Sequence, residues 1–139
     1  MTSEEHRQAA SSVADSREAA IAAARAAADK QADDVTILDV QELIVITDFF
    51  VICSGSTDRQ VKTIVEEVER ALRARDLRPV RREGEQESRW VLLDYVDVVV
   101  HVFGEEEREY YDLERLWADA PRIEWSGEDE VRASVGSAD

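Results

Sequence analysis

Five consecutive apolar residues at 49–53, Phe-Phe-Val-Ile-Cys, constrain the fold of this chain more than any other segment. A strand that is apolar on both faces has to be covered on both, which predicts a central strand of a sheet. A Ser-Gly-Ser turn follows at 54–56, and Thr57 and Gln60 then have the spacing of a capping box. A helix is therefore expected from this turn to about Ala74. Its predicted buried face consists of Val61, Ile64, Val65, Val68 and Leu72.

The other segments of regular structure are predicted from hydrophobic periodicity and turn residues. Strands are expected at 35–40, 80–83, 90–93 and 98–103, and residues 43–46 extend or bend the first of them. A closing helix is expected at 105–118, with Tyr110, Leu113, Leu116 and Trp117 on its buried side. The resulting order, α-β-β-α-β-β-β-α, predicts an α/β domain whose mixed β-sheet is flanked by helices.

Three segments are expected along the chain. Residues 1–15 are polar and small, without an apolar period, which is typical of a disordered arm. Residues 16–120 are expected to form the α/β domain, which begins with an alanine-rich first helix at 16–32. Because Ile21 is the only large apolar side chain of that helix, light packing against the domain is expected. Residues 121–139 are interpreted as an acidic flexible tail.

The formal net charge of −15 limits the classes of partner. Residues 34–120 carry 11 basic and 21 acidic side chains, so the acidity lies mainly on the expected domain. Sequence-independent binding of nucleic acid depends on Lys and Arg, so no nucleic-acid partner is expected. A basic protein is a suitable partner, although the charge also agrees with a role in solubility alone.

The cellular compartment is inferred from the cysteine count and the apolar runs. A single cysteine, Cys53, forms no intramolecular disulfide. The start of the chain lacks the basic and leucine-rich regions of a signal peptide, and no apolar run approaches the roughly 20 residues of a membrane span. A cytoplasmic protein without a membrane partner is therefore expected.

Few side chains have the type and spacing that catalysis needs. His6, His101 and Cys53 show no zinc-ligand spacing, so no metal and no cofactor are expected. A Cys53–His101 nucleophilic pair is conceivable, but a cysteine at the end of an apolar strand is more typical of an inert core residue. His101, inside an apolar strand, is more typical of a hydrogen-bonded structural residue.

The Ser-Gly-Ser turn at 54–56 could hold a phosphate at the start of the following helix. A strand, a Gly-Ser turn, a helix and a mixed sheet are also the layout of nucleotidyltransferases. Those enzymes hold Mg²⁺ with an Asp-x-Asp pair about ten residues later. This chain has Glu66, Glu67 and Glu69 on a helix instead. We therefore expect a nucleotidyltransferase-like fold without the catalytic carboxylate pair, and no enzymatic activity.

Basic side chains cluster in one place, between residues 70 and 82. The six arginines there are interleaved with acidic residues, which favours an ion-paired, solvated surface over an RNA contact.

The strand at 90–93 carries the most distinctive candidate binding residues. Alternation places Trp90, Leu92 and Asp94 on one face and Val91 and Leu93 on the other. An aromatic ring beside an aliphatic side chain and a carboxylate is suited to a basic protein partner. The alternative is that Trp90 is simply a core residue.

Several segments together resemble one family, the Iojap-like ribosomal silencing factors, also called RsfS. The matching segments span roughly residues 34–118 and occur in the order typical of the family. They are Leu-Asp-Val at 38–40, Thr-Asp-Phe-Phe-Val-Ile-Cys-Ser-Gly-Ser-Thr-Asp-Arg-Gln-Val at 47–61, Glu-Gly-Glu at 83–85, Trp-Val-Leu-Leu-Asp at 90–94, Asp-Val-Val-Val-His-Val-Phe at 97–103 and Tyr-Asp-Leu-Glu-Arg-Leu-Trp at 111–117.

The resemblance implies a homodimer without catalytic activity. It implies binding to the large-subunit ribosomal protein uL14, which sterically blocks association of the 30S and 50S subunits and represses translation under nutrient limitation. Trp90, Leu92 and Asp94 lie on the strand that the family uses for uL14, and Tyr111 and Leu116 of the closing helix are further candidate contacts.

Two departures from the family and two other hypotheses remain. The family usually has Gly at the position of Val96, so the turn before Asp97 is expected to differ locally, and both ends of the chain exceed the usual family length. A degenerate nucleotidyltransferase-fold protein with residual nucleotide binding at 54–56 is the first alternative. A dimeric scaffold with a different partner is the second.

Overall fold

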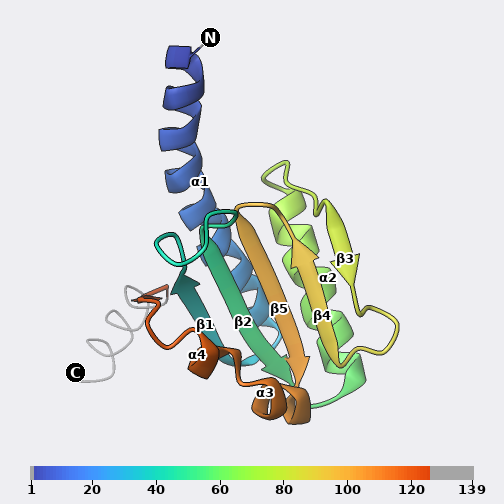
Figure 1. Ribbon diagram of the computed structural model, residues 1–139. Coiled ribbons are helices and arrows are strands. Elements are labelled where there is room, and N and C mark those ends of the chain that lie inside the picture. The colour runs from blue at the N-terminus through green and yellow to red at the C-terminus, as the bar shows by residue number, and fades with distance from the viewer. Residues whose placement is uncertain (1, 126–139) are drawn as a thin grey trace, which may run out of the picture.

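The computed structural model describes residues 2–125, and for residues 2–12 and 14 it describes the backbone only. The strands are β1 (Asp33–Asp39), β2 (Phe49–Gly55), β3 (Arg81–Glu83), β4 (Trp90–Asp94), β5 (Val98–Gly104) and β6 (Arg122–Ile123). The helices are α1 (Thr2–Asp29), α2 (Asp58–Arg73), α3 (Glu105–Tyr111) and α4 (Leu113–Leu116). The strands form a six-stranded sheet in the order β3-β4-β5-β2-β1-β6 (Figure 1).

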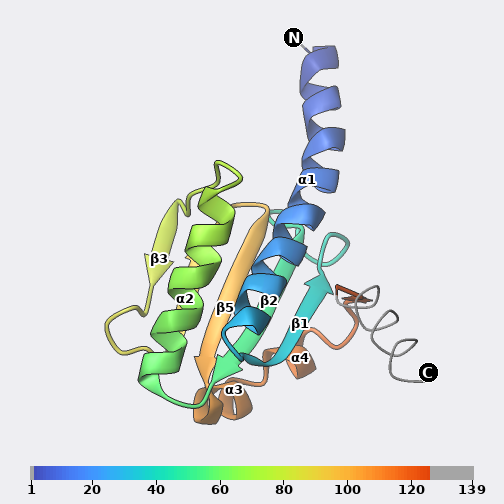
Figure 2. The same ribbon diagram turned by 180° about the vertical axis from the view of Figure 1, so that it is seen from behind.

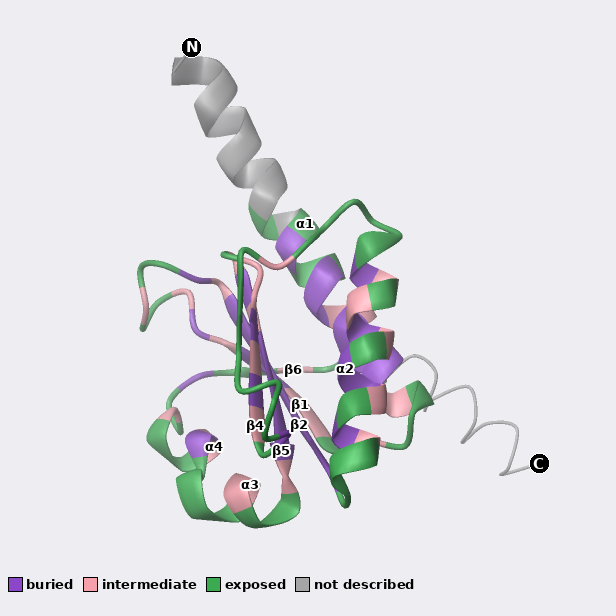
Figure 3. Cartoon of the chain, turned by 90° about the vertical axis from the view of Figure 1, so that its right-hand side faces the viewer, coloured by how far each residue is buried: buried purple, intermediate pink, exposed green. Residues whose placement is uncertain are grey.

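The sheet is mixed and β2 lies at its centre. Strand β2 pairs with β5 in parallel and with β1 antiparallel, and all of its residues are buried. Helices α1 and α2 cover one face of the sheet (Figure 2), and α3 and α4 lie on the opposite side (Figure 3). The prediction of an α/β domain with a mixed sheet flanked by helices is confirmed, as is the central position of residues 49–53.

Helix α2 begins as the capping pattern predicts. The hydroxyl of Thr57 accepts a hydrogen bond from the backbone N–H of Gln60 at 3.0 Å. The side chain of Gln60 accepts from the backbone N–H of Ser56 at 2.6 Å, one residue earlier than in a standard capping box. The five predicted apolar residues of this helix are all buried. Helix α2 is thereby fixed to the sheet next to the end of β2.

Helix α1 differs from its prediction in both extent and packing. It begins at Thr2, so the segment expected to be a disordered arm is helical, and it ends at Asp29. The first part of this helix projects beyond the sheet (Figure 1), so it needs no apolar stripe. Its alanine, glutamate, glutamine and arginine residues favour a helix by themselves. Light packing was the wrong expectation, because Ala20, Ala23 and Ala27 are completely buried. Small side chains let the helix backbone approach the sheet and α2 closely.

The segment after β5 also differs from its prediction. The expected single helix is interrupted at Asp112, which adopts a left-handed conformation with φ 47°. The interruption redirects the chain, so Leu113 is buried whereas Tyr110 and Leu116 are 81% and 70% exposed. The expected burial of Tyr110 and Leu116 is therefore wrong.

Part of the expected flexible tail belongs to the sheet. Strand β6 pairs antiparallel with β1, and the indole N–H of Trp125 donates to the carbonyl of Val35 at 3.0 Å. The domain thus includes residues 121–125, because Ile123 and Trp125 find partners on β1. The prediction of flexibility for residues 126–139 lies outside the described residues.

Residues 43–46 form a loop and do not extend β1. The backbone N–H groups of Leu43 and Ile44 both bond to the carbonyl of Val40, which turns the chain out of the sheet. The side chains of Val45 and Ile46 are 100% and 81% exposed. The expectation that these apolar residues extend or bend the strand pairing is therefore wrong. They form an apolar loop at the face of the sheet opposite α1 and α2.

Candidate protein-binding surface

Strand β4 presents a row of three side chains on the face of the sheet opposite α1 and α2. Burial alternates along the strand, with Val91 and Leu93 buried and Trp90, Leu92 and Asp94 partly exposed. This alternation agrees with the pattern read from the sequence. We call Trp90, Leu92 and Asp94 the exposed row.

Trp90 is held by aromatic neighbours at one end of the row. Its ring stacks on Phe103 with 4.9 Å between centroids, and Tyr111 lies at 4.5 Å. Its indole N–H donates to Nδ1 of His101 at 3.1 Å. The indole is therefore oriented by three contacts while part of its surface stays exposed.

The structure brings one of the two candidate residues after β5 to the exposed row. Tyr111, at the end of α3, contacts Trp90 directly. Leu116, on α4, projects outward and lies outside the apolar cluster that includes Trp90. Both side chains are nevertheless exposed and available to a partner.

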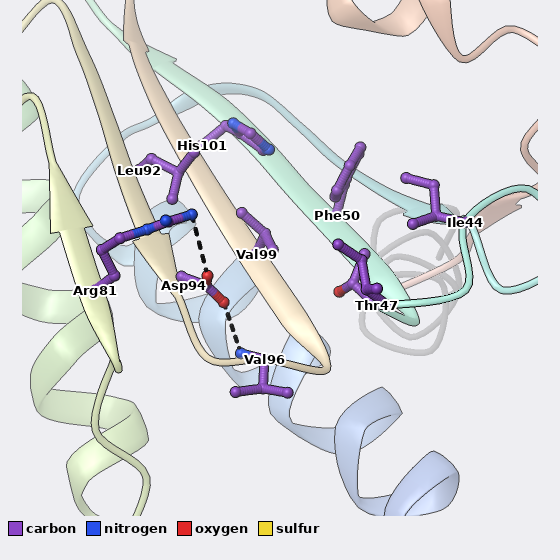
Figure 4. Close-up of a pocket in the computed structure, with 10 residues that line it drawn as sticks. Ile44, Thr47, Phe50, Arg81, Leu92, Asp94, Val96, Val99 and His101 are labelled. Atoms are coloured by element: carbon purple, nitrogen blue, oxygen red, sulfur yellow. Dashed lines mark hydrogen bonds and ion pairs between the residues drawn. The ribbon is translucent and has the colours of Figure 1, made fainter.

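A groove of about 390 Å³ opens at the other end of the row, where Asp94 lies. Asp94 accepts from the backbone N–H of Val96 at 2.8 Å and pairs with Arg81 at 3.5 Å (Figure 4). We call this the sheet-face groove. It is lined by Ile44, Ile46, Thr47, Phe50, Arg81, Leu92, Asp94, Val96, Val99 and His101.

His101 forms part of the groove floor and is a neutral imidazole. Burial lowers the pKa of His101 to about 4, so the ring carries one proton at neutral pH. Because Nδ1 accepts the hydrogen bond from Trp90, that proton resides on Nε2. The expectation that His101 is hydrogen-bonded within the protein is confirmed.

The Cys53–His101 pair is not formed. Cys53 pairs with Val102, and both face the layer of α1 and α2, whereas His101 pairs with Ile52 on the opposite face. Burial raises the pKa of the Cys53 thiol to about 12, so the thiolate is scarce. Cys53 is an inert core residue.

The Ser-Gly-Ser turn is poorly suited to a phosphate. The backbone N–H of Ser56 is engaged by Gln60 at 2.6 Å. The adjacent cavity is lined by Asp58 and by three glutamates at 105–107, with Arg89 as the counter-charge. These carboxylates repel an anionic ligand at close range. The described residues also contain no group of three or more His, Cys, Asp or Glu side chains that could hold a metal ion.

The arginine cluster is ion-paired at four positions, as the interleaved charges predict. The pairs join Arg70 to Glu67, Arg75 to Glu18, Arg81 to Glu83 and Asp94, and Arg82 to Glu69 and Glu85. Several of them connect different elements of the fold. The arginines at these four positions therefore serve as ion-pair partners within the fold.

Arg108 fastens the segment after β5 to the sheet, a role that the sequence pattern does not predict. Its guanidinium donates to Glu114 at 3.2 Å and to the carbonyl of Asp34 at 2.7 Å. Arg108 and Glu114 lie on different short helices, so no helical spacing signals the pair. The contact holds α3 and α4, and hence Tyr111, beside the exposed row.

A family profile described as "Ribosomal silencing factor during starvation" matches residues 13–139. The chain belongs to this family. Ribosomal silencing factor RsfS of Bacillus subtilis is 46% identical over 99 residues, which cover 71% of this chain and 84% of that protein. RsfS of Halalkalibacterium halodurans is 44% identical over 105 residues, covering 76% and 90% respectively. A crystal structure from Chromobacterium violaceum has a TM-score of 0.71 and 34% identity, covering 73% of this chain and 85% of that one.

Val96 lies in the turn between β4 and β5, at the position where the resemblance implies a glycine. Val96 has φ 75°, a left-handed conformation that a β-branched residue rarely adopts. A glycine would occupy this conformation without strain. Val96 therefore places a strained residue at the rim of the groove.

Within residues 2–125, none of the helices combines the length and the apolar character of a membrane span.

Proposed function

We propose that this member of the ribosomal silencing factor family binds uL14 on the 50S subunit. The bound protein sterically blocks association with the 30S subunit and represses translation under nutrient limitation. The function needs no catalytic step, so the protein acts as a binding module. The exposed row on the face of the sheet opposite α1 and α2 is the observation that carries this proposal.

The chemistry of the row supports a protein partner. Trp90 is a large ring already fixed by Phe103 and His101, so little side-chain entropy is lost when a partner covers it. Tryptophan is also enriched among residues that dominate binding energy. Leu92 supplies apolar area next to the ring, and Tyr111 and Leu116 extend the surface.

Charge supports a basic partner such as a ribosomal protein. The chain has a formal net charge of −15, and complementary potentials accelerate association and select partners. Asp94 provides one carboxylate within the row, although this carboxylate also forms an ion pair with Arg81. The proposal also includes a homodimer, as the family resemblance implies, and a cytoplasmic location, as the cysteine count and the apolar runs predict.

The nucleotidyltransferase-like description of the fold stays a prediction. Residual nucleotide binding is disfavoured by the occupied Ser56 N–H and by the acidic side chains around it. Calorimetric titration with a nucleotide and Mg²⁺ is expected to give no heat of binding.

The proposal is tested by subunit joining in vitro. Purified protein is incubated with 50S subunits before 30S subunits are added, and 70S formation is followed by sedimentation. We expect co-sedimentation with 50S subunits and loss of 70S particles. Trp90→Ala is expected to weaken binding to uL14 by roughly 2 kcal/mol, or about 30-fold, because a central aromatic anchor is removed.

Glu66→Gln is the matched control, because Glu66 is exposed on α2, on the opposite side of the sheet. It is expected to block subunit joining as well as the unmodified protein does. Unchanged 70S formation at saturating concentrations of the unmodified protein would contradict the proposed function.

A further inference from the structure

Two buried polar atoms without partners line the same groove. Thr47 and His101 are each 5% exposed, and both line the sheet-face groove. Among the residues that the structure describes, neither Oγ1 of Thr47 nor Nε2 of His101 has a hydrogen-bond partner. A buried polar group without a partner destabilises a protein by about 1–3 kcal/mol, so native structures contain few. Two in one groove indicate that a ligand satisfies them.

The direction of one missing hydrogen bond is known. Nδ1 of His101 is occupied by Trp90, so Nε2 carries the proton and requires an acceptor. The nearest aromatic neighbour is Phe50, whose ring is T-shaped to the imidazole with 5.0 Å between the ring centroids. A ring contact is a weak substitute for an oxygen acceptor. A carbonyl oxygen is the acceptor that proteins offer most often.

The walls of the groove are suited to an aliphatic side chain. Leu92 and Val99 lie on neighbouring strands, Phe50 lies on the next one, and Ile44 stands opposite (Figure 4). Neither polar atom is exposed in the free protein. An occupant reaches them when partly exposed wall side chains such as Leu92 and Ile44 change rotamer, as interface side chains commonly do.

Charge and position decide the class of occupant. The chain carries a formal net charge of −15, which favours a basic protein over an acidic one or a second copy of itself. The groove is continuous with the exposed row, since Leu92 and Asp94 belong to both. A partner that covers Trp90 therefore reaches the groove along β4.

We infer that the sheet-face groove holds an extended segment of the basic protein partner. One aliphatic side chain of the segment enters the groove, a main-chain carbonyl accepts from Nε2 of His101, and a neighbouring main-chain polar group bonds to Oγ1 of Thr47. The inference rests on the proposed function for the identity of that partner, uL14.

Two pairs of matched variants test each hydrogen bond. Thr47→Val removes the hydroxyl and keeps the shape of the side chain, whereas Thr47→Ser keeps the hydroxyl. His101→Asn keeps an acceptor near the position of Nδ1 for Trp90 but removes the donor at Nε2. His101→Gln places an amide donor near the position of Nε2. Affinity for purified uL14 is measured by calorimetry, and the free energy of unfolding of each variant is measured in urea.

We expect Thr47→Val and His101→Asn each to weaken binding about tenfold, because each leaves a polar group of the partner buried without a bond. Thr47→Ser should bind within about threefold of the unmodified protein. His101→Gln should bind more tightly than His101→Asn, because it keeps a donor near Nε2, although it lacks the Nδ1 acceptor for Trp90. The free energy of unfolding of Thr47→Val should be unchanged or higher, since an unpartnered hydroxyl is removed. A structural role for Thr47 predicts the opposite change in stability.

Each other outcome overturns the inference in a recognisable way. If Trp90→Ala abolishes binding while the groove variants bind normally, the groove is not occupied by uL14 and the proposed function stands. If the unmodified protein does not bind uL14, both the inference and the proposed function fail. If the groove variants alter only the monomer–dimer equilibrium, the occupant is a second copy. Equal losses of affinity and stability in Thr47→Val would assign the hydroxyl a structural role instead.

Discussion

Trp90 and His101 are joined across β4 and β5 by a hydrogen bond of 3.1 Å from the indole N–H to Nδ1 of the imidazole. The bond connects the aromatic end of the exposed row to the floor of the sheet-face groove. It also fixes the imidazole tautomer, since an acceptor nitrogen cannot carry the proton. The exposed row and the sheet-face groove are thus connected by this hydrogen bond.

The buried imidazole makes stability depend on pH. The pKa of His101 is about 4 in the native protein against about 6.5 for an unperturbed histidine. Between these values the unfolded chain binds more protons than the native one, so stability falls as the pH falls. The contribution of the neutral His101 to the free energy of unfolding is complete above the pKa of the unfolded chain. It is lost as the pH falls toward the pKa of the native protein.

Urea unfolding of the unmodified protein and of His101→Asn checks this dependence. Between about pH 7.5 and about pH 5, the unmodified protein should lose about 2 kcal/mol more than the variant. Taking the difference cancels the titration of all other groups. Equal losses in both proteins, or a native His101 that titrates by NMR near its ordinary pKa, would show that the ring is accessible to protons.

Val96→Gly is expected to raise the free energy of unfolding by about 1 kcal/mol. Val96 adopts φ 75°, and a left-handed conformation is unfavourable by about 1–2 kcal/mol for a residue with a Cβ. The side chain is 51% exposed, so little packing is lost. Val96→Ala is the control and should gain less, because it keeps the Cβ. A glycine variant no more stable than the alanine variant would refute the account of strain.

Leu116→Ser tests whether α4 belongs to the docking surface. Leu116 is 70% exposed, so the free energy of unfolding should change by less than about 0.5 kcal/mol. Binding to 50S subunits should weaken about tenfold in a sedimentation assay. Leu77→Ser, at a partly exposed leucine that follows α2, is the comparison and should bind normally. Normal binding by both variants would remove Leu116 from the proposed site.

Ala23→Leu is expected to destabilise the protein by about 1–3 kcal/mol, because a larger side chain has no space between α1 and the sheet. Ala23 is fully buried, whereas Ala28 on the same helix is partly exposed. Ala28→Leu should therefore cost less. Thermal unfolding of both variants measures the difference, and equal melting temperatures would contradict close packing of α1.

The parts of the fold that could be predicted from sequence are those with local signals. Strand β2 is apolar throughout and α2 has both a cap and a regular apolar spacing, so each was located from its own residues. The break at Asp112 has no such signal, because one left-handed residue leaves the surrounding helical pattern intact. Strand β6 has two residues and exists through pairing with β1, which sequence spacing does not reveal.

The candidate site could be predicted only in part for the same reason. Alternation within β4 is local, and it placed Trp90, Leu92 and Asp94 on one face. The groove depends on the loop at 43–46 standing across from β4, a relationship between segments far apart in sequence. The sequence around Thr47 therefore does not predict that its hydroxyl is buried in a groove without a hydrogen-bond partner.

The central position of β2 has a consequence for the energetics of association. Strand β2 is paired on both sides and buried along its whole length, so the sheet beneath the candidate surface keeps its backbone shape when a partner arrives. Within this sheet, binding then orders side chains and leaves the backbone as it is. A preorganised surface of this kind loses little conformational entropy, which lets a small contact area support a stable complex.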